Sequence, residues 1–264
     1  MGADGPSLRQ LVAPNPGPFT FDGTRTWIVG RRHVLVIDPG PAIDEHLESI
    51  VEACADAQQV TLTVTHQHAD HAAGLQRLAM LLRALAAGPS VHAHAPERSE
   101  LVTGGPTPIL PVREGYRLST DAGLVEVVAT PGHSRDHVAY WWRSRGALFC
   151  GDLVLGHGDT TWVGEYEGCV ADYFASLGRL RSLGASVLHP GHGPDLPDPA
   201  DALARFEAHR RQRVSQVRAV RDRYPDEWRA VLYNEVYRGR VPVGLERAAR
   251  SSLHALADYV DTHG

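Results

Sequence analysis

The segment Thr65–His71 reads THQHADH, and its possible metal ligands are His66, His68, Asp70 and His71. It follows the β-branched run Val60–His66, which predicts a strand, and it leads into a helical pattern. Because side chains alternate along an extended chain, we expect His66 and His68 on one side and the other two ligands on another. Imidazole nitrogens and carboxylates are the ligands that zinc prefers. This segment therefore predicts ligands for two neighbouring metal ions.

Three more motifs each place one possible ligand at the end of a strand-like run. TPGH ends at His133, FCGD ends at Asp152, and HPGHGP contains His192. Gly191 and Gly193 flank His192 and allow a backbone conformation that other residues rarely adopt. Together with the first segment, these motifs predict one metal site. Its residues are His66, His68, Asp70, His71, His133, Asp152 and His192.

Short apolar runs that end in turn residues predict strands. They are Trp27–Gly30, His33–Gly40, Val60–His66, Val125–His133, Ala147–Asp152 and Ser186–His192. Apolar residues at three- and four-residue spacing predict helices between some of these strands. They are Glu45–Ala55, Ala73–Ala87 and Val170–Leu183. Such a mixture of strands and helices indicates a layered α/β fold.

Beyond Pro199 the pattern becomes helical. A first helix is expected over residues 200–223, a second from near Pro225–Asp226, and a third through Leu245 and Val260. The proline-rich stretch PDLPDPA precedes these helices. We therefore expect a catalytic domain over residues 1–199 and a small helical subdomain over residues 200–264.

The composition of the 264 residues is that of a well-packed globular protein, with 43% hydrophobic residues, 22% charged residues and a net charge of −5. This charge argues against a surface that binds nucleic acid or anionic lipid throughout. Residues 1–199 contain 14 Arg and 22 acidic residues, whereas residues 200–264 contain 12 Arg and 9 acidic residues. The tail is therefore mildly basic and permits an anionic partner without requiring one.

The cysteines and the apolar runs bear on the compartment. Cys54, Cys150 and Cys169 are widely spaced and form no CxxC motif, which is typical of free thiols in a reducing compartment. No run approaches the roughly 18 consecutive apolar residues of a membrane helix, and no secretory signal pattern is visible. We expect a cytoplasmic protein with no membrane partner, and the sequence leaves its oligomeric state open.

The motif HxHxDH, followed by a lone His, an Asp and a final His, resembles the pattern of the metallo-β-lactamase superfamily, and every position is filled here. The resemblance covers nearly the whole chain. VIDPGP, GDLVLGHGDTTW, VLHPGHGPDLPD and the helical tail look most like the lactamase-β-like branch, which includes an endoribonuclease acting on single-stranded RNA. The resemblance implies an αββα sandwich with the metals at one edge and a winged-helix-like module at residues 200–264.

The same resemblance implies how the ligands divide. His66, His68 and His133 would hold one metal, and Asp70, His71 and His192 the other, with Asp152 bridging both. Asp38 matches a position that orients the metal-binding loop. Two stretches depart from the family pattern, Thr24–Arg25–Thr26 in place of TNT and Ala72–Ala73–Gly74 in place of Ser/Thr-Gly-Gly. Neither change affects a ligand, and both bear on substrate preference.

Two zinc ions about 3.5–4 Å apart can share a bridging water and lower its pKa from about 15.7 toward 7. We therefore expect a metal-dependent hydrolase that attacks with hydroxide, in which Asp152 fixes the metals and Asp70 carries a proton to the leaving group. The donor set also suits manganese or iron. The leading expectation is a dinuclear zinc hydrolase whose substrate is single-stranded RNA or another phosphodiester.

Three alternatives stay open at this point. One is a glyoxalase-II-like hydrolase of small thioesters or lactones, with β-lactam hydrolysis as a side activity, which the net charge of −8 over residues 1–199 favours over a polyanion. Another is a persulfide dioxygenase with a single iron. The last is a metal-binding protein whose tail binds nucleic acid without catalysis.

The tail and the other histidines carry further expectations. If the substrate is RNA, tail arginines would contact its phosphates; they are Arg210, Arg211, Arg213, Arg218, Arg221 and Arg223. The alternative is that these arginines only solvate a helix. His137 and His189 are expected to support the ligands or the core, and His157 to edge the substrate cleft. His92 and His94 are expected on a strand with ordinary packing.

Overall fold

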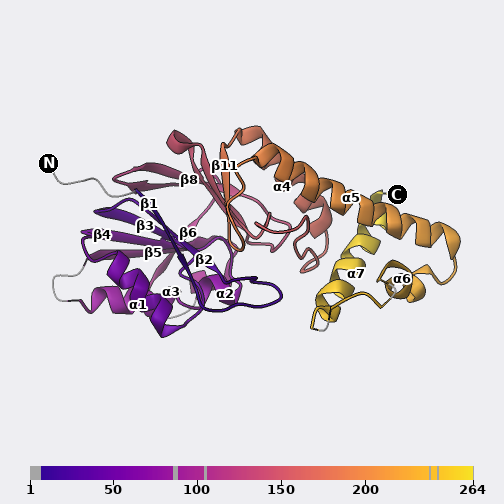
Figure 1. Cartoon of the computed structure of the whole chain (residues 1–264), viewed down its shortest axis with the longest axis horizontal. Coiled ribbons are helices and arrows are strands. Elements are labelled where there is room, and N and C mark those ends of the chain that lie inside the picture. The colour runs from indigo at the N-terminus through magenta and orange to yellow at the C-terminus, as the bar shows by residue number, and fades with distance from the viewer. Residues whose placement is uncertain (1–6, 86–88, 104–105, 238, 243, 264) are drawn as a thin grey trace.

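The computed structural model describes residues 7–85, 89–103, 106–237, 239–242 and 244–263, and it contains two β-sheets between layers of helices (Figure 1). The first sheet has the strand order β1-β2-β3-β4-β5-β6, in which β3 to β6 run parallel. Its strands are β1 (Leu8–Val12), β2 (Arg25–Val29), β3 (His33–Ile37), β4 (Gln59–Thr63), β5 (Ser90–Pro96) and β6 (Ile109–Val112). The second sheet has the order β11-β10-β9-β8-β7. Its strands are β7 (Arg117–Thr120), β8 (Gly123–Ala129), β9 (Val138–Trp142), β10 (Ala147–Gly151) and β11 (Val187–Pro190).

Alternating side chains on β3 explain the layers. Leu35 and Ile37 point into a core that both sheets share, where they join Tyr140 and Phe149 of the second sheet. Val34 and Val36 point to the opposite face and pack with the helices outside the first sheet. A strand that is buried on both faces reads as a continuous apolar run, as HVLVI does.

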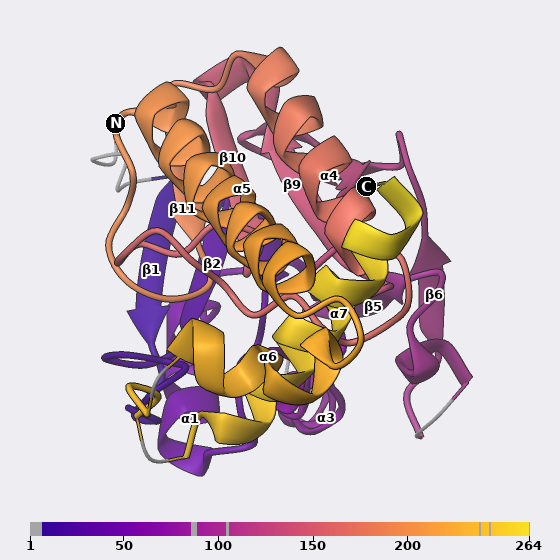
Figure 2. The same cartoon turned by 90° about the vertical axis from the view of Figure 1, so that its right-hand side faces the viewer.

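Helices cover the outer face of each sheet. The first sheet is covered by α1 (Asp44–Ala53) and α3 (Leu75–Arg83), whose buried residues include Leu47, Ile50 and Leu78. The second sheet is covered by α4 (Cys169–Leu183) and α5 (Pro199–Arg223), which run across β9, β10 and β11 in Figure 2. The predicted αββα sandwich is thereby confirmed.

The tail consists of α5, α6 (Trp228–Tyr237) and α7 (Glu246–His263). The helix α5 begins with Pro199, and the Asp198 side chain accepts a hydrogen bond from the Asp201 amide, which satisfies a free amide at the helix start. The second tail helix begins at Trp228, slightly later than the expected Pro225–Asp226. No strand occurs among the described residues beyond Pro199, so the β-wing of a winged-helix module is not seen there.

Most expected elements occur at the expected places, with ends that differ by a few residues. The helix expected over Ala73–Ala87 corresponds to α3, and its expected end falls on residues 86–88, which lie outside the described residues. The short helix α2 (Ala69–Ala72) precedes it and was not predicted as a separate element. The runs that form β1, β6, β7 and β9 were not among the predicted strands. No helix within the described ranges is long and apolar enough to cross a membrane.

Candidate metal centre

The seven predicted metal ligands all lie in the segments that directly follow strands. The first four come from the turn after β4 and the start of α2, where Asp70 and His71 occupy the first helical turn. His133 follows β8, Asp152 follows β10 and His192 follows β11. The two sheets end next to each other at this edge, because the backbone amide of Arg25 donates to the carbonyl of Gly191 and the amide of Val138 donates to the carbonyl of Thr65.

Three imidazoles form the first of two groups. The Nδ1 atom of His68 lies 2.9 Å from Nε2 of His66 and 3.0 Å from Nε2 of His133. One nitrogen of each ring lies within 4.8 Å of the others, which is close enough for all three to bind one ion. Such a cluster of imidazole nitrogens, with no carboxylate among its members, matches the ligand set of a zinc ion.

The second group contains two imidazoles and two carboxylates. The Nε2 atoms of His71 and His192 lie 3.2 Å apart, and Oδ2 of Asp70 lies 3.2 Å from the His192 nitrogen. Asp152 places Oδ1 at 3.4 Å from Nε2 of His71 and Oδ2 at 3.4 Å from Nε2 of His192. The four ligand atoms are close enough together to hold a second ion.

Asp152 lies between the two groups. Its Oδ2 atom is 3.7 Å from Nε2 of His133, a member of the first group. Its Oδ1 atom is buried and has no hydrogen-bond partner among the described residues. A buried carboxylate oxygen without a donor is unfavourable unless a cation satisfies it. The geometry therefore fits a carboxylate that two metal ions share.

The outer nitrogen of each imidazole is held by a further group. His71 Nδ1 donates to Oδ2 of Asp38 at 2.9 Å, and His133 Nδ1 donates to the carbonyl of Trp162 at 2.8 Å. His66 Nδ1 lies 3.0 Å from Oγ1 of Thr65, and His192 Nδ1 lies 3.3 Å from the carbonyl of Gly23. Such contacts fix the tautomer and orientation of metal-binding imidazoles.

Glu165 supports the remaining imidazole and is a residue that sequence reasoning missed. Its Oε1 atom lies 3.5 Å from Nε2 of His68, and its Oε2 atom accepts a hydrogen bond from the Arg135 amide. Glu165 lies in an irregular loop 97 positions beyond His68 in the chain. No local spacing in the sequence pairs these residues.

The electrostatics differ between the two groups. Burial lowers the pKa of His66 far below its usual range and lowers the pKa of His133 to about 4, which leaves neutral imidazoles with free lone pairs. Burial alone would lower the pKa of His192 too, but the Asp152 carboxylate outweighs it and raises this pKa to about 9. The pKa of His71 rises in the same way, through Asp152, Asp70 and Asp38. The second group therefore attracts positive charge.

Two glycines allow the loops to approach the ligands. A Cβ atom at Gly191 would lie 2.5 Å from Oδ1 of Asp152 and 2.6 Å from Cε1 of His71. Gly151 has a φ of +49°, and its Cβ atom would lie 2.6 Å from Nε2 of His137. The expectation that Gly191 serves an unusual backbone conformation is corrected here, because only Gly193 of the HPGHGP pair has a positive φ. Lack of space is what requires glycine at position 191.

The neighbouring histidines occupy supporting places. His137 is buried, accepts a hydrogen bond from the Asp152 amide and contacts the Thr130 hydroxyl. His189 stacks on Phe149, and its Nδ1 lies 3.0 Å from a carboxylate oxygen of Asp195. His157 is exposed with its ring edge against Phe21.

Other residues from the sequence analysis lie outside the ligand groups. His92 and His94 lie on β5, as expected. Arg25 is buried and paired with Asp22, and its amide donates to the carbonyl of Gly191. It therefore flanks the His192 turn without reaching a ligand atom.

Comparisons with known proteins agree with this geometry. Residues 20–192 match the family model of the metallo-beta-lactamase superfamily. The chain is 27% identical over 235 residues to a beta-lactamase-like protein 2 homolog of Caenorhabditis elegans, which covers 88% of this chain and 76% of that protein. It is 33% identical over 221 residues to an atrochrysone carboxyl ACP thioesterase of Aspergillus terreus, which covers 82% of this chain but only 63% of that enzyme.

A solved structure extends the likeness over the tail. A metallo-beta-lactamase family protein from Thermus thermophilus has a TM-score of 0.74 at 21% identity, with 98% of this chain and 94% of that chain covered. Fold, ordered motifs and relatives therefore lead to one conclusion: this chain belongs to the metallo-beta-lactamase superfamily and is a metal-dependent hydrolase.

Proposed function

We propose that this chain is a dinuclear metallohydrolase that cleaves thioesters. The observation that carries the proposal is the pair of ligand groups on either side of Asp152. We assign His66, His68 and His133 to one ion, and Asp70, His71 and His192 to the other, with Asp152 shared. Zinc suits this mixture of imidazole and carboxylate, with manganese and iron as alternatives.

The residues would divide the chemistry as follows. Bound ions would supply Lewis acidity and an acidified water. The Asp70 side chain is 30% exposed and touches His192, so it can accept a proton from the attacking water and return it to the leaving thiolate. The water oxygen bonds to the acyl carbon and the C–S bond breaks, which gives a carboxylic acid and a thiol. Asp152, at 10% exposure, holds the two groups at a fixed separation.

Relatives support a thioester as the substrate. Several similar proteins are named as acyl carrier protein thioesterases, and two of them are 32% and 33% identical to this chain. The chain spans 46% and 63% of those two enzymes. Because the chain matches only part of those enzymes, we propose thioesterase activity for it on the basis of this likeness.

The tail arginines give little support to the RNA expectation. Arg210 is only 3% exposed and donates to the carbonyl of Thr161, which disfavours a contact with a phosphate at the surface of the helix. Arg211 forms an ion pair with Glu207, and Arg223 lies 3.7 Å from a carboxylate oxygen of Glu235. Arg218 and Arg221 donate to carbonyl groups at the end of α7. These contacts favour a structural role for this face of α5.

Metal content and a substrate panel test the proposal together. Purified protein should carry about two metal equivalents by elemental analysis, and His68→Ala should lose mainly one of them. The loaded protein should hydrolyse an acyl thioester faster than single-stranded RNA, a lactone, a β-lactam or a persulfide. One tightly bound iron with persulfide oxidation would replace the proposal with the dioxygenase reaction, and preferred cleavage of RNA would restore the phosphodiesterase expectation.

A further inference from the structure

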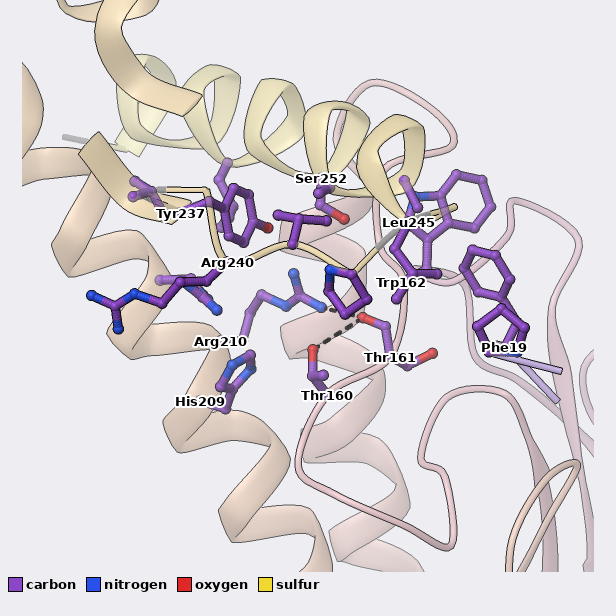
Figure 3. A pocket seen from close by; sticks show the side chains of 18 of the residues that line it. Phe19, Thr160, Thr161, Trp162, His209, Arg210, Tyr237, Arg240, Leu245 and Ser252 are labelled. Atoms are coloured by element: carbon purple, nitrogen blue, oxygen red, sulfur yellow. Dashed lines mark hydrogen bonds between the residues drawn. The ribbon is translucent and has the colours of Figure 1, made fainter. Parts of the chain in front are cut away.

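A cavity of about 580 Å³ lies between the loops of the catalytic part and the three tail helices (Figure 3), and we call it the tail pocket. Phe19 and Trp162 contribute loop side chains, and Arg213, Tyr237 and Leu245 contribute tail side chains. This volume lies within the range of about 300–1,000 Å³ that small-molecule sites occupy.

The tail pocket adjoins the metal centre through one short loop. Trp162 lines the pocket, and its ring centre lies 5.8 Å from the ring centres of both His68 and His133. The neighbouring Thr161 also lines the pocket and places Oγ1 at 3.4 Å from Nδ1 of His133. A substrate whose reacting bond lies at the ligand groups can therefore extend past Trp162 into the pocket.

The two ends of the pocket differ in chemistry. Phe19, Trp162 and Leu245 gather at one end in Figure 3, whereas His209, Arg210 and Arg240 lie toward the other. Three arginines line the pocket, and none of its described lining residues is acidic, although the chain contains 31 Asp and Glu residues. The lining therefore combines aromatic surface with uncompensated positive charge.

Arg210 is the strongest sign of a missing anion. Its side chain is 3% exposed, donates to the Thr161 carbonyl at 2.7 Å and lies over the ring of Tyr173. Its Nε atom is buried without a hydrogen-bond partner, and none of the described carboxylates forms an ion pair with it. A buried guanidinium without a counter-ion is costly, and an anion in the adjoining cavity would offset that cost.

Two further arginines extend this positive charge toward solvent. Arg213 lies over the ring of Tyr237 and donates to the Gln216 side chain, which leaves other donors of its guanidinium group available. The side chain of Arg240 is exposed and makes no ion pair or hydrogen bond with the part of the chain that the structure describes. Both residues can turn toward a bound oxyanion without breaking an ion pair.

We infer that the tail pocket binds an oxyanion of the substrate, carried at a distance from the scissile thioester by an apolar stretch that packs on Trp162 and Phe19. This inference rests on the proposed thioesterase activity. The oxyanion can be a carboxylate on the acyl chain or a phosphate on the thiol arm, and both present the same acceptor oxygens to arginine. The pocket thus selects an amphipathic anionic thioester over a neutral one.

Kinetics with four thioester substrates distinguish a carboxylate on the acyl chain from a phosphate on the thiol arm. The acyl chain ends in a methyl group or a carboxylate, and the thiol is N-acetylcysteamine, which lacks phosphate, or coenzyme A. At least one anionic substrate should have a KM about tenfold or more below that of the doubly neutral one, as expected for a charge-assisted hydrogen bond. The charge that lowers KM lies either on the acyl chain or on the thiol, and this shows which half of the substrate supplies the oxyanion. Equal KM values for all four substrates would overturn the inference.

Two matched variants test whether the KM difference between anionic and neutral thioesters arises in the tail pocket. Arg240→Gln should raise the KM of the preferred anionic thioester about tenfold and leave that of the neutral thioester unchanged. Arg211→Gln is the control, because Arg211 lies on the same tail, is paired with Glu207 and does not line the pocket. A rise in KM that is equal for neutral and anionic thioesters in Arg240→Gln would contradict specific recognition of charge.

A binding measurement separates this inference from the proposed activity. Naphthalene-2-sulfonate should bind the metal-loaded protein more tightly than methyl 2-naphthyl sulfone, its neutral counterpart, in calorimetric titration. Arg240→Gln should reduce this preference several-fold and Arg211→Gln should retain it in full. If no thioester is hydrolysed while the preference is present, the proposed function fails and the anion site remains. If thioesters are hydrolysed without any such preference, the anion site fails alone.

Discussion

Asp38 accepts a hydrogen bond from His71, with 2.9 Å between Oδ2 and Nδ1, and both side chains are buried. The same carboxylate accepts hydrogen bonds from the amide and the hydroxyl of Thr65. Asp38 therefore holds both ends of the THQHADH segment. It does so with a φ of +55°, a conformation that Asp and Asn tolerate better than most residues.

The Asp38→Asn variant should keep this backbone but lose an acceptor. An amide offers only one acceptor oxygen, so it cannot accept from Thr65 and His71 as the carboxylate does. We expect metal affinity to fall about 10–100-fold, as for other outer partners of ligating imidazoles. Competition with a chelator measures this loss. Asp44→Asn, at an exposed ion pair with Arg77, is the control, and equal affinities in both variants would refute the role of Asp38.

Asp152→Asn should impair turnover more than replacement of any one ligating histidine by alanine. The substitution keeps the shape but removes the negative charge that lies between the two ligand groups, where two dications would otherwise repel each other. Steady-state kinetics and elemental analysis on the same samples measure the effect. Near-normal turnover with two bound metals would show that Asp152 does not bridge them.

Glu165→Gln should weaken the first metal site through His68. Loss of the charge near Nε2 makes the imidazole a poorer ligand, and we expect about a tenfold loss of metal affinity, with partial recovery in Glu165→Asp. Glu167→Gln is the matched control, because Glu167 lies two residues away in an exposed position. Identical chelator competition curves for the two glutamine variants would leave Glu165 without a positioning role.

The three cysteines should resist thiol reagents in the folded protein. Burial raises the pKa of Cys54 to about 11, and burial also raises the pKa of Cys150 and Cys169. At pH 8 only roughly one Cys54 in a thousand would be a thiolate, which is the reactive form. A colorimetric thiol assay should therefore detect all three cysteines only after denaturation. Rapid reaction of one thiol in the native protein would contradict this burial.

Local patterns made much of the fold and the ligand groups predictable. Each ligand lies where an apolar run meets a turn residue, and the carboxyl ends of β4 and β10 lie at the same edge, where a Cβ atom at Gly151 would lie 2.9 Å from Cβ of Thr65. The position of each motif at the end of a strand therefore predicted that the ligands lie close together. The run VAYWW of β9 was missed, although it is a continuous apolar run that is buried on both faces, as HVLVI of β3 is.

The supporting contacts could not be predicted, because they join distant parts of the chain. Glu165 and His68 meet only after two loops fold together, and Trp162 meets His133 in the same way. The burial of Arg210 was also unpredictable from the helix alone. Arg211 and Arg213 lie beside it in the same helix, and the sequence does not distinguish them from Arg210. Only Arg210 packs against the loop that contains Thr161.

Two successive carbonyl groups, those of Thr161 and Trp162, face opposite neighbours, Arg210 of the tail and His133 of the metal centre. The Thr161–Trp162 segment therefore links the tail to the metal centre through two adjacent hydrogen bonds. A tail transplanted from a relative to change substrate choice must also bring a buried donor for Thr161. A graft that matches only helix lengths would loosen His133 and lose metal before any new selectivity could be observed.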